Sequence, residues 1–150
     1  MSAWTGPVKD PSYDPSCTFC RVVAGELDAP IVYDDADTIG FLDHRPVFKG
    51  HVLVVPRAHV VTLPDLASDR LGPYFAVVQR VARALPEVLG AQGTWVAENN
   101  VVSQSVPHLH VHVVPRTKGD GLRGFFWPRT KYAAGEADAY AGRIRAALAS

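Results

Sequence analysis

The segment over residues 108–116 constrains this chain more than any other, because histidine alternates there with aliphatic residues: His108-Leu109-His110-Val111-His112-Val113-Val114-Pro115-Arg116. Alternation with a period of two is typical of a strand that has one buried face. We therefore predict a strand over 106–114 in which the three imidazoles share one face and the aliphatic side chains share the other.

Three imidazoles on one face are costly, because they give up hydrophobic packing and repel one another when more than one is protonated. A single strand histidine is most simply explained as a hydrogen-bonded, partly buried side chain. Three in alternation instead predict a ligand. Either they bind a metal ion, or one attacks a phosphorus centre while its neighbours hold the anion and move protons.

Polar residues flank the histidines and favour phosphorus chemistry. Glu98-Asn99-Asn100 ends the preceding predicted strand, and Gln104-Ser105 stands just before His108. Their amides and hydroxyl are the donors that a phosphate oxygen or a leaving group needs. The alternative is that Asn99, Asn100 and Ser103 only build the turn between two strands.

The remaining hydrophobic patterns predict the other elements of one α/β domain of the α+β type. Runs rich in β-branched and aromatic residues predict strands at 30–33, 38–42, 50–56 and 94–97. Helical spacing of apolar residues predicts a long helix over 71–85, with Pro73 in its first turn and with Pro86 and Gly90 limiting its end. A short helical turn is expected over 19–24 and an alanine-rich helix over 136–148.

Length and charge exclude several classes of protein. A chain of 150 residues with 47% hydrophobic content suits a single domain, here over 17–116, preceded by a proline-rich extended arm over 1–16 and followed by an aromatic loop and helix over 117–150. Fifteen basic residues balance fifteen acidic ones, so no net positive field would hold nucleic acid or a membrane. No signal peptide or membrane-spanning run is evident, and we expect a cytoplasmic protein.

The only two cysteines of the chain form a C-x-x-C motif, Cys17-Thr18-Phe19-Cys20. In a reducing compartment such a pair more often binds a metal or performs redox chemistry than forms a structural disulfide. The motif supplies half of a zinc site at most, so the residues alone leave these alternatives open.

The pattern Gln104-Ser105-Val106-Pro107-His108-Leu109-His110-Val111-His112-Val113-Val114-Pro115-Arg116 resembles the signature of the histidine triad (HIT) superfamily, whose members act on nucleotide phosphate bonds. The resemblance extends back to Cys17 through 25–26, 32–35, 41–43 and 50–57. It implies a five-stranded antiparallel sheet with one long helix and a C-terminal helix. It also implies a homodimer in which two sheets form one continuous ten-stranded sheet.

The resemblance further implies a nucleotide hydrolase that cleaves a phosphoramidate or a dinucleoside polyphosphate of a purine nucleotide. His110 would attack the α-phosphorus, and water would cleave the nucleotidyl-histidine intermediate. The third triad position holds His112, where a transferase branch has glutamine, and this favours hydrolysis. The implied catalytic residues are His51, Gln104, Ser105, His110 and His112, and these bind nucleotide together with Phe41, Asp43 and Asn100. The alternative function is a nucleotide-binding adaptor or sensor with negligible turnover.

The resemblance also implies a structural zinc ion held by Cys17, Cys20, His59 and His108, a closed Cys₂His₂ set. Otherwise His59 would be an exposed loop residue and the cysteines an idle reduced pair. The segment over 100–104 lacks the glycine usual in this family, so either Asn99 or Asn100 is expected to contact phosphate, and we favour Asn100. The aromatic stretch over 119–129 is expected either to contact substrate or to pack in a dimer interface.

Overall fold

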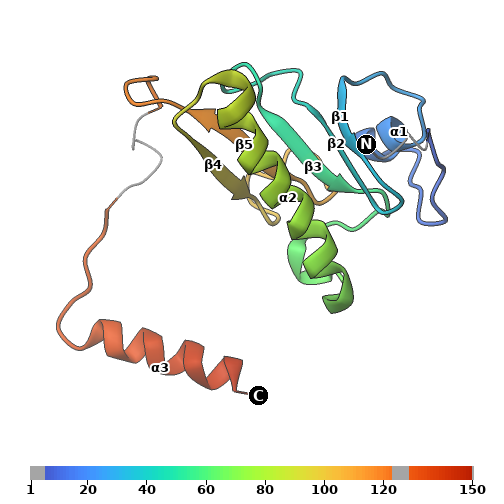
Figure 1. The fold of residues 1–150 in the computed structure, drawn as a ribbon. Helices are drawn as coiled ribbons and strands as arrows, with labels where there is room; N and C mark the ends of the chain where they lie inside the picture. The colour runs from blue at the N-terminus through green and yellow to red at the C-terminus, as the bar shows by residue number, and fades with distance from the viewer. Residues whose placement is uncertain (1–5, 123–128, 150) are drawn as a thin grey trace. The chain divides into compact units, whose positions relative to one another are not determined.

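The computed structural model describes residues 6–122 and 129–149 and divides into two units, Met1–Lys118 and Gly119–Ser150 (Figure 1). The first unit holds a five-stranded sheet in the order β1-β2-β3-β5-β4, with every neighbouring pair antiparallel, as predicted. Its strands are β1 Ile31–Asp34, β2 Thr38–Leu42, β3 Val52–Pro56, β4 Gly93–Glu98 and β5 Val111–Arg116. Its helices are α1 Thr18–Val23, the 3₁₀ turn η1 Leu63–Asp65, and α2 Ser68–Leu89.

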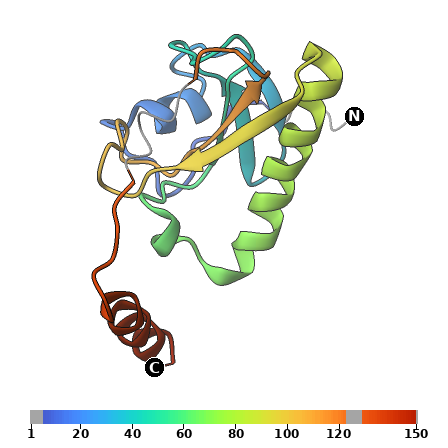
Figure 2. The same ribbon diagram turned by 90° about the vertical axis from the view of Figure 1, so that its left-hand side faces the viewer.

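The two faces of the sheet carry separate hydrophobic clusters. Along β3, Val52 and Val54 belong to the cluster packed under α2, whereas Leu53 and Val55 belong to the cluster packed under α1. Figures 1 and 2 show α2 along one face and α1 at the other. Because side chains alternate along a strand, the central strand β3 contributes side chains to both cores, and the two faces of the sheet carry different sets of side chains.

Strand β5 is shorter than predicted. It begins at Val111, so only His112 lies within it, and the prediction of a strand from Val106 is wrong for its first half. Just before β5 the backbone hydrogen-bonds to the loop after β3: the Leu109 N–H donates to the Val60 carbonyl at 2.7 Å. The predicted alternation nevertheless holds through this extended approach. Leu109 and Val111 pack under α2, while the rings of His108 and His110 meet Phe19 of α1 edge-on.

Helix α2 is longer than predicted at both ends. It begins at Ser68, which places Pro73 in the second turn, and it continues through Pro86 to Leu89. Each proline removes one backbone donor. A buried face of five residues outweighs that loss, since tertiary packing provides most of a helix's stability: Tyr74, Val77, Val78, Val81 and Leu85. The helix ends at Gly90, whose φ of 70° few other residues adopt.

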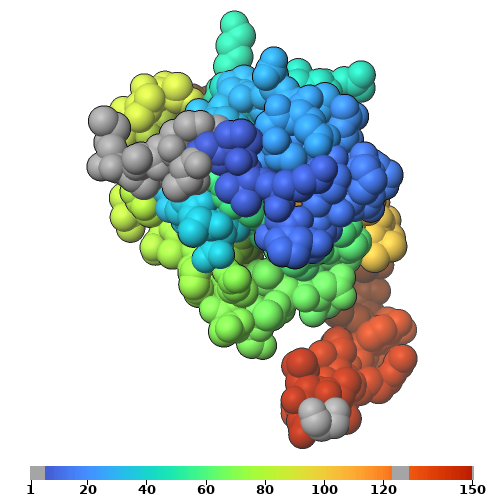
Figure 3. Space-filling view, turned by 90° about the vertical axis from the view of Figure 1, so that its right-hand side faces the viewer, coloured from blue at the N-terminus to red at the C-terminus, as the bar shows by residue number. Residues whose placement is uncertain are grey.

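The N-terminal segment that the structure describes lies on the surface of the first unit (Figure 3). Its hydrogen bonds include those from Val8 N–H to the Val23 carbonyl, from His59 N–H to the Ser12 hydroxyl, and from the Tyr13 hydroxyl to Glu26. The second bond ties the arm to the loop after β3. The described part of the arm contains turns at 11–12 and 15–16 and is hydrogen-bonded to the domain.

The second unit contains α3, Glu136–Leu148, with the predicted bounds. None of its residues is buried, and Tyr140 stacks beside Tyr132 with ring centroids 5.8 Å apart. Most of the predicted aromatic contact loop, residues 123–128, lies outside the described residues. Within the described residues, no helix has the length and apolar character needed to span a membrane.

The loop between β4 and the histidines contains backbone strain. Val101 has a φ of 69°, a left-handed conformation that costs a β-branched residue about 1 kcal/mol or more. Its side chain is 75% exposed and packs in no core. Because asparagine tolerates this conformation, Val101→Asn is expected to raise the melting temperature by roughly 2–4 °C. Val102→Asn is the control, since Val102 is equally exposed but is not left-handed. Equal melting temperatures for the two variants would contradict this account.

Candidate active site and metal centre

A cavity of about 620 Å³ opens on the α1 face of the sheet. One part of its wall is apolar and includes Phe19, Leu27 and Phe41. Polar side chains line another part, among them Asp43, Ser105, His110 and His112, with Thr18, Asp28, His44 and Arg45 at the same wall. An apolar wall beside carboxylate, hydroxyl and imidazole groups suits a ligand with a flat apolar part and a polar, anionic part. A smaller cavity of about 260 Å³ lies beside α2, and its arginines, Arg57 and Arg70, already pair with aspartates.

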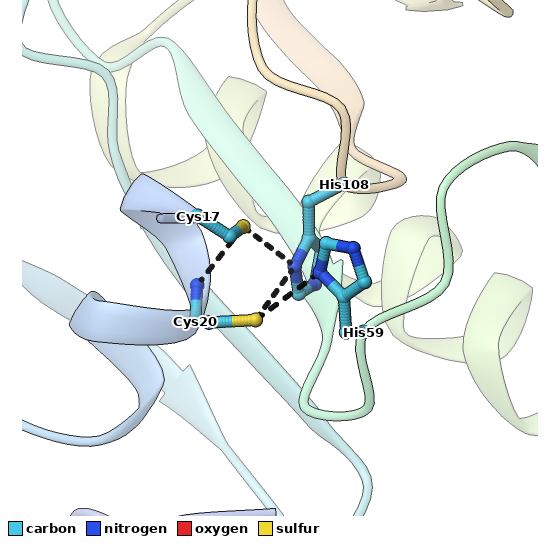
Figure 4. Close-up of side chains that lie close together, drawn as sticks. All are labelled: Cys17, Cys20, His59 and His108. Atoms are coloured by element: carbon cyan, nitrogen blue, oxygen red, sulfur yellow. Dashed lines mark hydrogen bonds between the residues drawn. The ribbon is translucent and has the colours of Figure 1, made fainter. Parts of the chain in front are cut away.

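Four potential metal ligands meet beside this cavity: Cys17, Cys20, His59 and His108 (Figure 4). They come from three segments distant in sequence, and all four ligand atoms lie within 4.8 Å of one another. Sulfur-to-nitrogen distances are 3.4 Å from Cys17 to His108, 3.2 Å from Cys20 to His59, and 3.6 Å from Cys20 to His108. A tetrahedral zinc ion with ordinary bond lengths separates its sulfur and nitrogen ligands by about 3.6 Å. The donor set therefore fits zinc in both chemistry and spacing.

The proton on His108 is placed by a backbone group. Its Nε2 lies 2.8 Å from the Pro56 carbonyl, which can only accept, so Nε2 carries the hydrogen. The lone pair of Nδ1 is then directed toward the two sulfur atoms, as ligation requires. Burial lowers the pKa of His108 to about 4, which keeps the ring neutral at pH 7. Burial also raises the pKa of the Cys20 thiol to about 11, so metal binding would release its proton.

The tautomer of His110 is fixed in the same way, with the opposite orientation. Its Nδ1 lies 2.7 Å from the carbonyl oxygen of His108, so Nδ1 donates and Nε2 keeps its lone pair. The ring is 3% exposed and contacts Phe19 and His112 edge-on, with centroids 5.1 and 5.0 Å away. His110 therefore presents an unprotonated nitrogen from a ring that its neighbours hold in place.

A second cluster joins the loop after β2 to β5. The Val47 N–H donates to His51 Nδ1 at 3.1 Å, and His51 Nε2 lies 2.9 Å from His112 Nδ1 and 3.7 Å from an Asp43 carboxylate oxygen. Burial lowers the pKa of His51, and it lowers that of His112 to about 4. Gly50, which precedes His51, has a φ of 99°, a conformation that favours glycine.

The structure brings most of the predicted site residues to the cavity, but not all of them. Phe41, Asp43, Ser105, His110 and His112 line it, and His51 contacts His112 behind the wall. Asn100 and Gln104 do not line it. Their amides stabilise the loop: Asn100 accepts from Leu63 N–H, and Gln104 donates to the Val61 carbonyl and accepts from Val101 N–H. Asn99, the other candidate, donates to the Ser103 carbonyl.

Sequence reasoning missed two kinds of participant. One is Phe19, whose ring packs on His108 and His110 and lines the cavity. Its place between the two cysteines is the signal that would have found it. The other kind is the main-chain groups of Val47, Pro56 and His108 that set the imidazole protons. Any residue carries such groups, so no side-chain pattern marks them.

Comparisons with a family model, with solved structures and with curated proteins agree on one family. The HIT domain model matches residues 24–119. A solved HIT family member from Bacillus subtilis is 33% identical, with 90% of this chain and 99% of that chain covered and a TM-score of 0.81. A zinc-bound histidine triad family protein from Mycobacterium smegmatis is 37% identical, with 88% of this chain and 97% of that chain covered and a TM-score of 0.68. The adenosine 5'-monophosphoramidase hnt1 of Schizosaccharomyces pombe is 30% identical over 115 residues, 75% of this chain and 84% of the relative.

Proposed function

This chain belongs to the HIT domain family, and from that premise we propose that it is a hydrolase of nucleotidyl conjugates, cleaving at the α-phosphate to release a nucleoside monophosphate. The substrates would be purine nucleoside phosphoramidates or dinucleoside polyphosphates. The relative named adenosine 5'-monophosphoramidase supports the first class. The cavity, with its apolar wall and its imidazole edge, is large enough for a nucleoside monophosphate and part of a leaving group.

One observation carries the proposal: the hydrogen bond from His110 Nδ1 to the His108 carbonyl. It leaves the Nε2 lone pair available as a nucleophile at the edge of the cavity without any deprotonation step. In the first step a bond forms from Nε2 to the α-phosphorus while the bond to the leaving group breaks. The leaving group departs with that electron pair and takes up a proton. Water then attacks phosphorus, its proton passes to solvent, and His110 is restored.

The other residues of the cavity wall position the substrate. Phe41 and Phe19 would contact the base, and the Asp43 carboxylate would accept hydrogen bonds from the ribose hydroxyls. The Ser105 hydroxyl would donate to a phosphate oxygen or to the leaving group, and His112 would do so from its Nε2. Gln104 and Asn100, which are held in the loop, act through the loop conformation rather than by contact.

We assign the cluster of Cys17, Cys20, His59 and His108 to one zinc ion. Four protein ligands leave no position open for substrate, so the ion would be structural, tying the N-cap of α1 to the segment before β5. The ion would also hold His108, whose carbonyl orients His110. The zinc-bound relative from Mycobacterium smegmatis supports this assignment.

Turnover assays test the function directly. The protein is incubated with adenosine phosphoramidate and with diadenosine polyphosphates, and release of AMP is followed. We expect catalytic turnover of at least one substrate. If AMP binds but no substrate is cleaved, the hydrolase proposal fails and a nucleotide-binding adaptor or sensor takes its place. A cytoplasmic location remains a prediction from the sequence.

A homodimer through the β4 edge remains part of the proposal. Strand β4 ends the sheet, Val96 on it is 43% exposed, and Phe75 of α2 is also an exposed apolar residue. Pairing there would give the ten-stranded sheet. We expect sedimentation equilibrium to report twice the 16.2 kDa chain mass and Val96→Lys to weaken the dimer. Val32→Lys, on the opposite edge strand, is the matched control and should have no effect. A wild-type monomer would contradict the dimer.

A further inference from the structure

We propose that His51 is a positioning residue that fixes the tautomer of His112, so that His112 always presents a protonated Nε2 to the cavity. The proposal rests on the hydrolase function for its catalytic consequence. Its structural part concerns two imidazoles and one backbone amide, and it can be tested in the ligand-free protein.

The positions of the hydrogens on His51 and His112 follow from one backbone group. The Val47 amide is a donor, and its bond to His51 Nδ1 at 3.1 Å requires that nitrogen to be unprotonated. A neutral imidazole then carries its hydrogen on Nε2. That hydrogen lies on the line to His112 Nδ1, 2.9 Å away, so His112 Nδ1 must accept. The hydrogen of His112 is consequently on its Nε2, and His112 lines the cavity.

The surroundings of His51 favour the same arrangement. Besides His112 Nδ1, the groups facing its Nε2 include the Asp43 carboxylate at 3.7 Å, which attracts an N–H and repels a lone pair. The side chain is 3% exposed, so water does not offer an alternative partner. The turn before β3, in which the His51 N–H donates to the Phe48 carbonyl, keeps the Val47 N–H beside the ring. A flip of the His51 proton to Nδ1 would set two N–H groups against each other.

The hydrogen on His51 Nε2 argues against a metal ion bound by the cluster around His51. Asp43, His51 and His112 offer three ligand atoms within 4.8 Å of one another, a spacing that a divalent cation would accept. Ligation by His51 Nε2 would require its hydrogen to move to Nδ1, against the Val47 amide. We therefore assign the trio to proton placement, in contrast to the cysteine-containing set, where the backbone bond of His108 leaves the ligating nitrogen bare.

The catalytic consequence is a division of roles between neighbouring imidazoles. His110 has its bare nitrogen toward substrate, because the His108 carbonyl takes its hydrogen bond. His112 has its N–H toward substrate, because His51 donates to the opposite nitrogen. A nucleophile needs the first state, and a donor to a phosphate oxygen or leaving group needs the second. Two backbone groups of opposite polarity thus give two adjacent histidines opposite tautomers.

Imidazole NMR of protein with ¹⁵N-labelled histidine tests the tautomers without any substrate. We expect the His112 spectrum to show an unprotonated Nδ1 and a protonated Nε2, with the same pattern for His51. In His51→Leu, which keeps the buried volume apolar, His112 is expected to become a mixture of tautomers. In His51→Gln, whose side-chain amide can still donate, the wild-type state of His112 is expected to persist.

Kinetics with the substrate found for the wild type provide the second readout. For His51→Leu we expect kcat to fall about tenfold or more with KM little changed, and for His51→Gln we expect most of kcat to return. Lys49→Gln, at an exposed position of the same turn that does not line the cavity, is the control and should match the wild type.

Three results would overturn the inference: a wild-type His112 protonated on Nδ1, an unchanged kcat in a folded His51→Leu, or a second zinc ion bound through His51 and His112. If His51→Leu does not fold, the tautomer of His112 in the wild-type NMR spectrum and the tautomer and kcat of His51→Gln still confirm or refute the inference. If the wild type cleaves no conjugate, the hydrolase proposal fails, while the NMR measurement still confirms or refutes the tautomer of His112.

Discussion

Replacing His110 with alanine is expected to reduce kcat on the order of 10⁴-fold or more, because the nitrogen that we propose forms the nucleotidyl intermediate is lost. Nucleotide binding should largely survive, since the apolar wall, Asp43 and Ser105 are untouched. AMP release from the substrate found in the turnover assays measures the first effect, and calorimetric titration with AMP measures the second.

The matched control is Lys49→Ala, which also truncates a side chain to alanine, but at an exposed position that does not line the cavity. Its kcat should equal that of the wild type. Quenching wild-type turnover with alkaline denaturant, in which a phosphorus–nitrogen bond survives, should also leave one nucleotidyl group on the peptide that contains His110, detected by mass spectrometry. Turnover by His110→Ala at a wild-type rate, or an adduct on His112 instead, would refute the role assigned to His110.

Loss of the zinc ion is expected to be the largest effect on stability. Cys17→Ser removes one of four ligands from a set that links α1, the loop after β3 and the segment before β5. Metal loss is among the few changes that cost about 4 kcal/mol or more. For a chain of this length that corresponds to a fall in melting temperature on the order of 10 °C. Zinc content by atomic absorption should fall from one ion per chain to near zero.

The zinc prediction has an activity component as well. Without the ion, the His108 carbonyl is less firmly placed, and His110 loses the partner that orients it. We therefore expect kcat to fall in Cys17→Ser even at temperatures where the protein is folded. Ser16→Ala, an exposed neighbour outside the ligand set, should keep both zinc and activity. Unchanged zinc stoichiometry in Cys17→Ser would exclude the assigned ligands.

The architecture could be predicted from local pattern to a large extent. Alternating residues placed histidines on one face and aliphatic side chains on the other, because face alternation is a property of any extended backbone. That remained true of His108 and His110 although they precede the strand. The strand boundary was predicted wrongly, since it depends on which neighbour the backbone meets, here the Val60 carbonyl. The extent of α2 past Pro86 depended likewise on a buried face that outweighs two lost donors.

The residues of the candidate site were identified by sequence, whereas their chemical states were decided by tertiary structure. Side-chain type and spacing identified the three alternating imidazoles and the paired thiols, and the resemblance to the family added His51 and His59. Which nitrogen holds each proton depends on backbone groups of Pro56, Val47 and His108 that the fold brings within about 3 Å. Every residue carries a backbone N–H or C=O, so no sequence pattern identifies the backbone groups that fix the imidazole hydrogens. The roles proposed for the three alternating histidines, as ligand, nucleophile and donor, thus depend on contacts made across the folded chain.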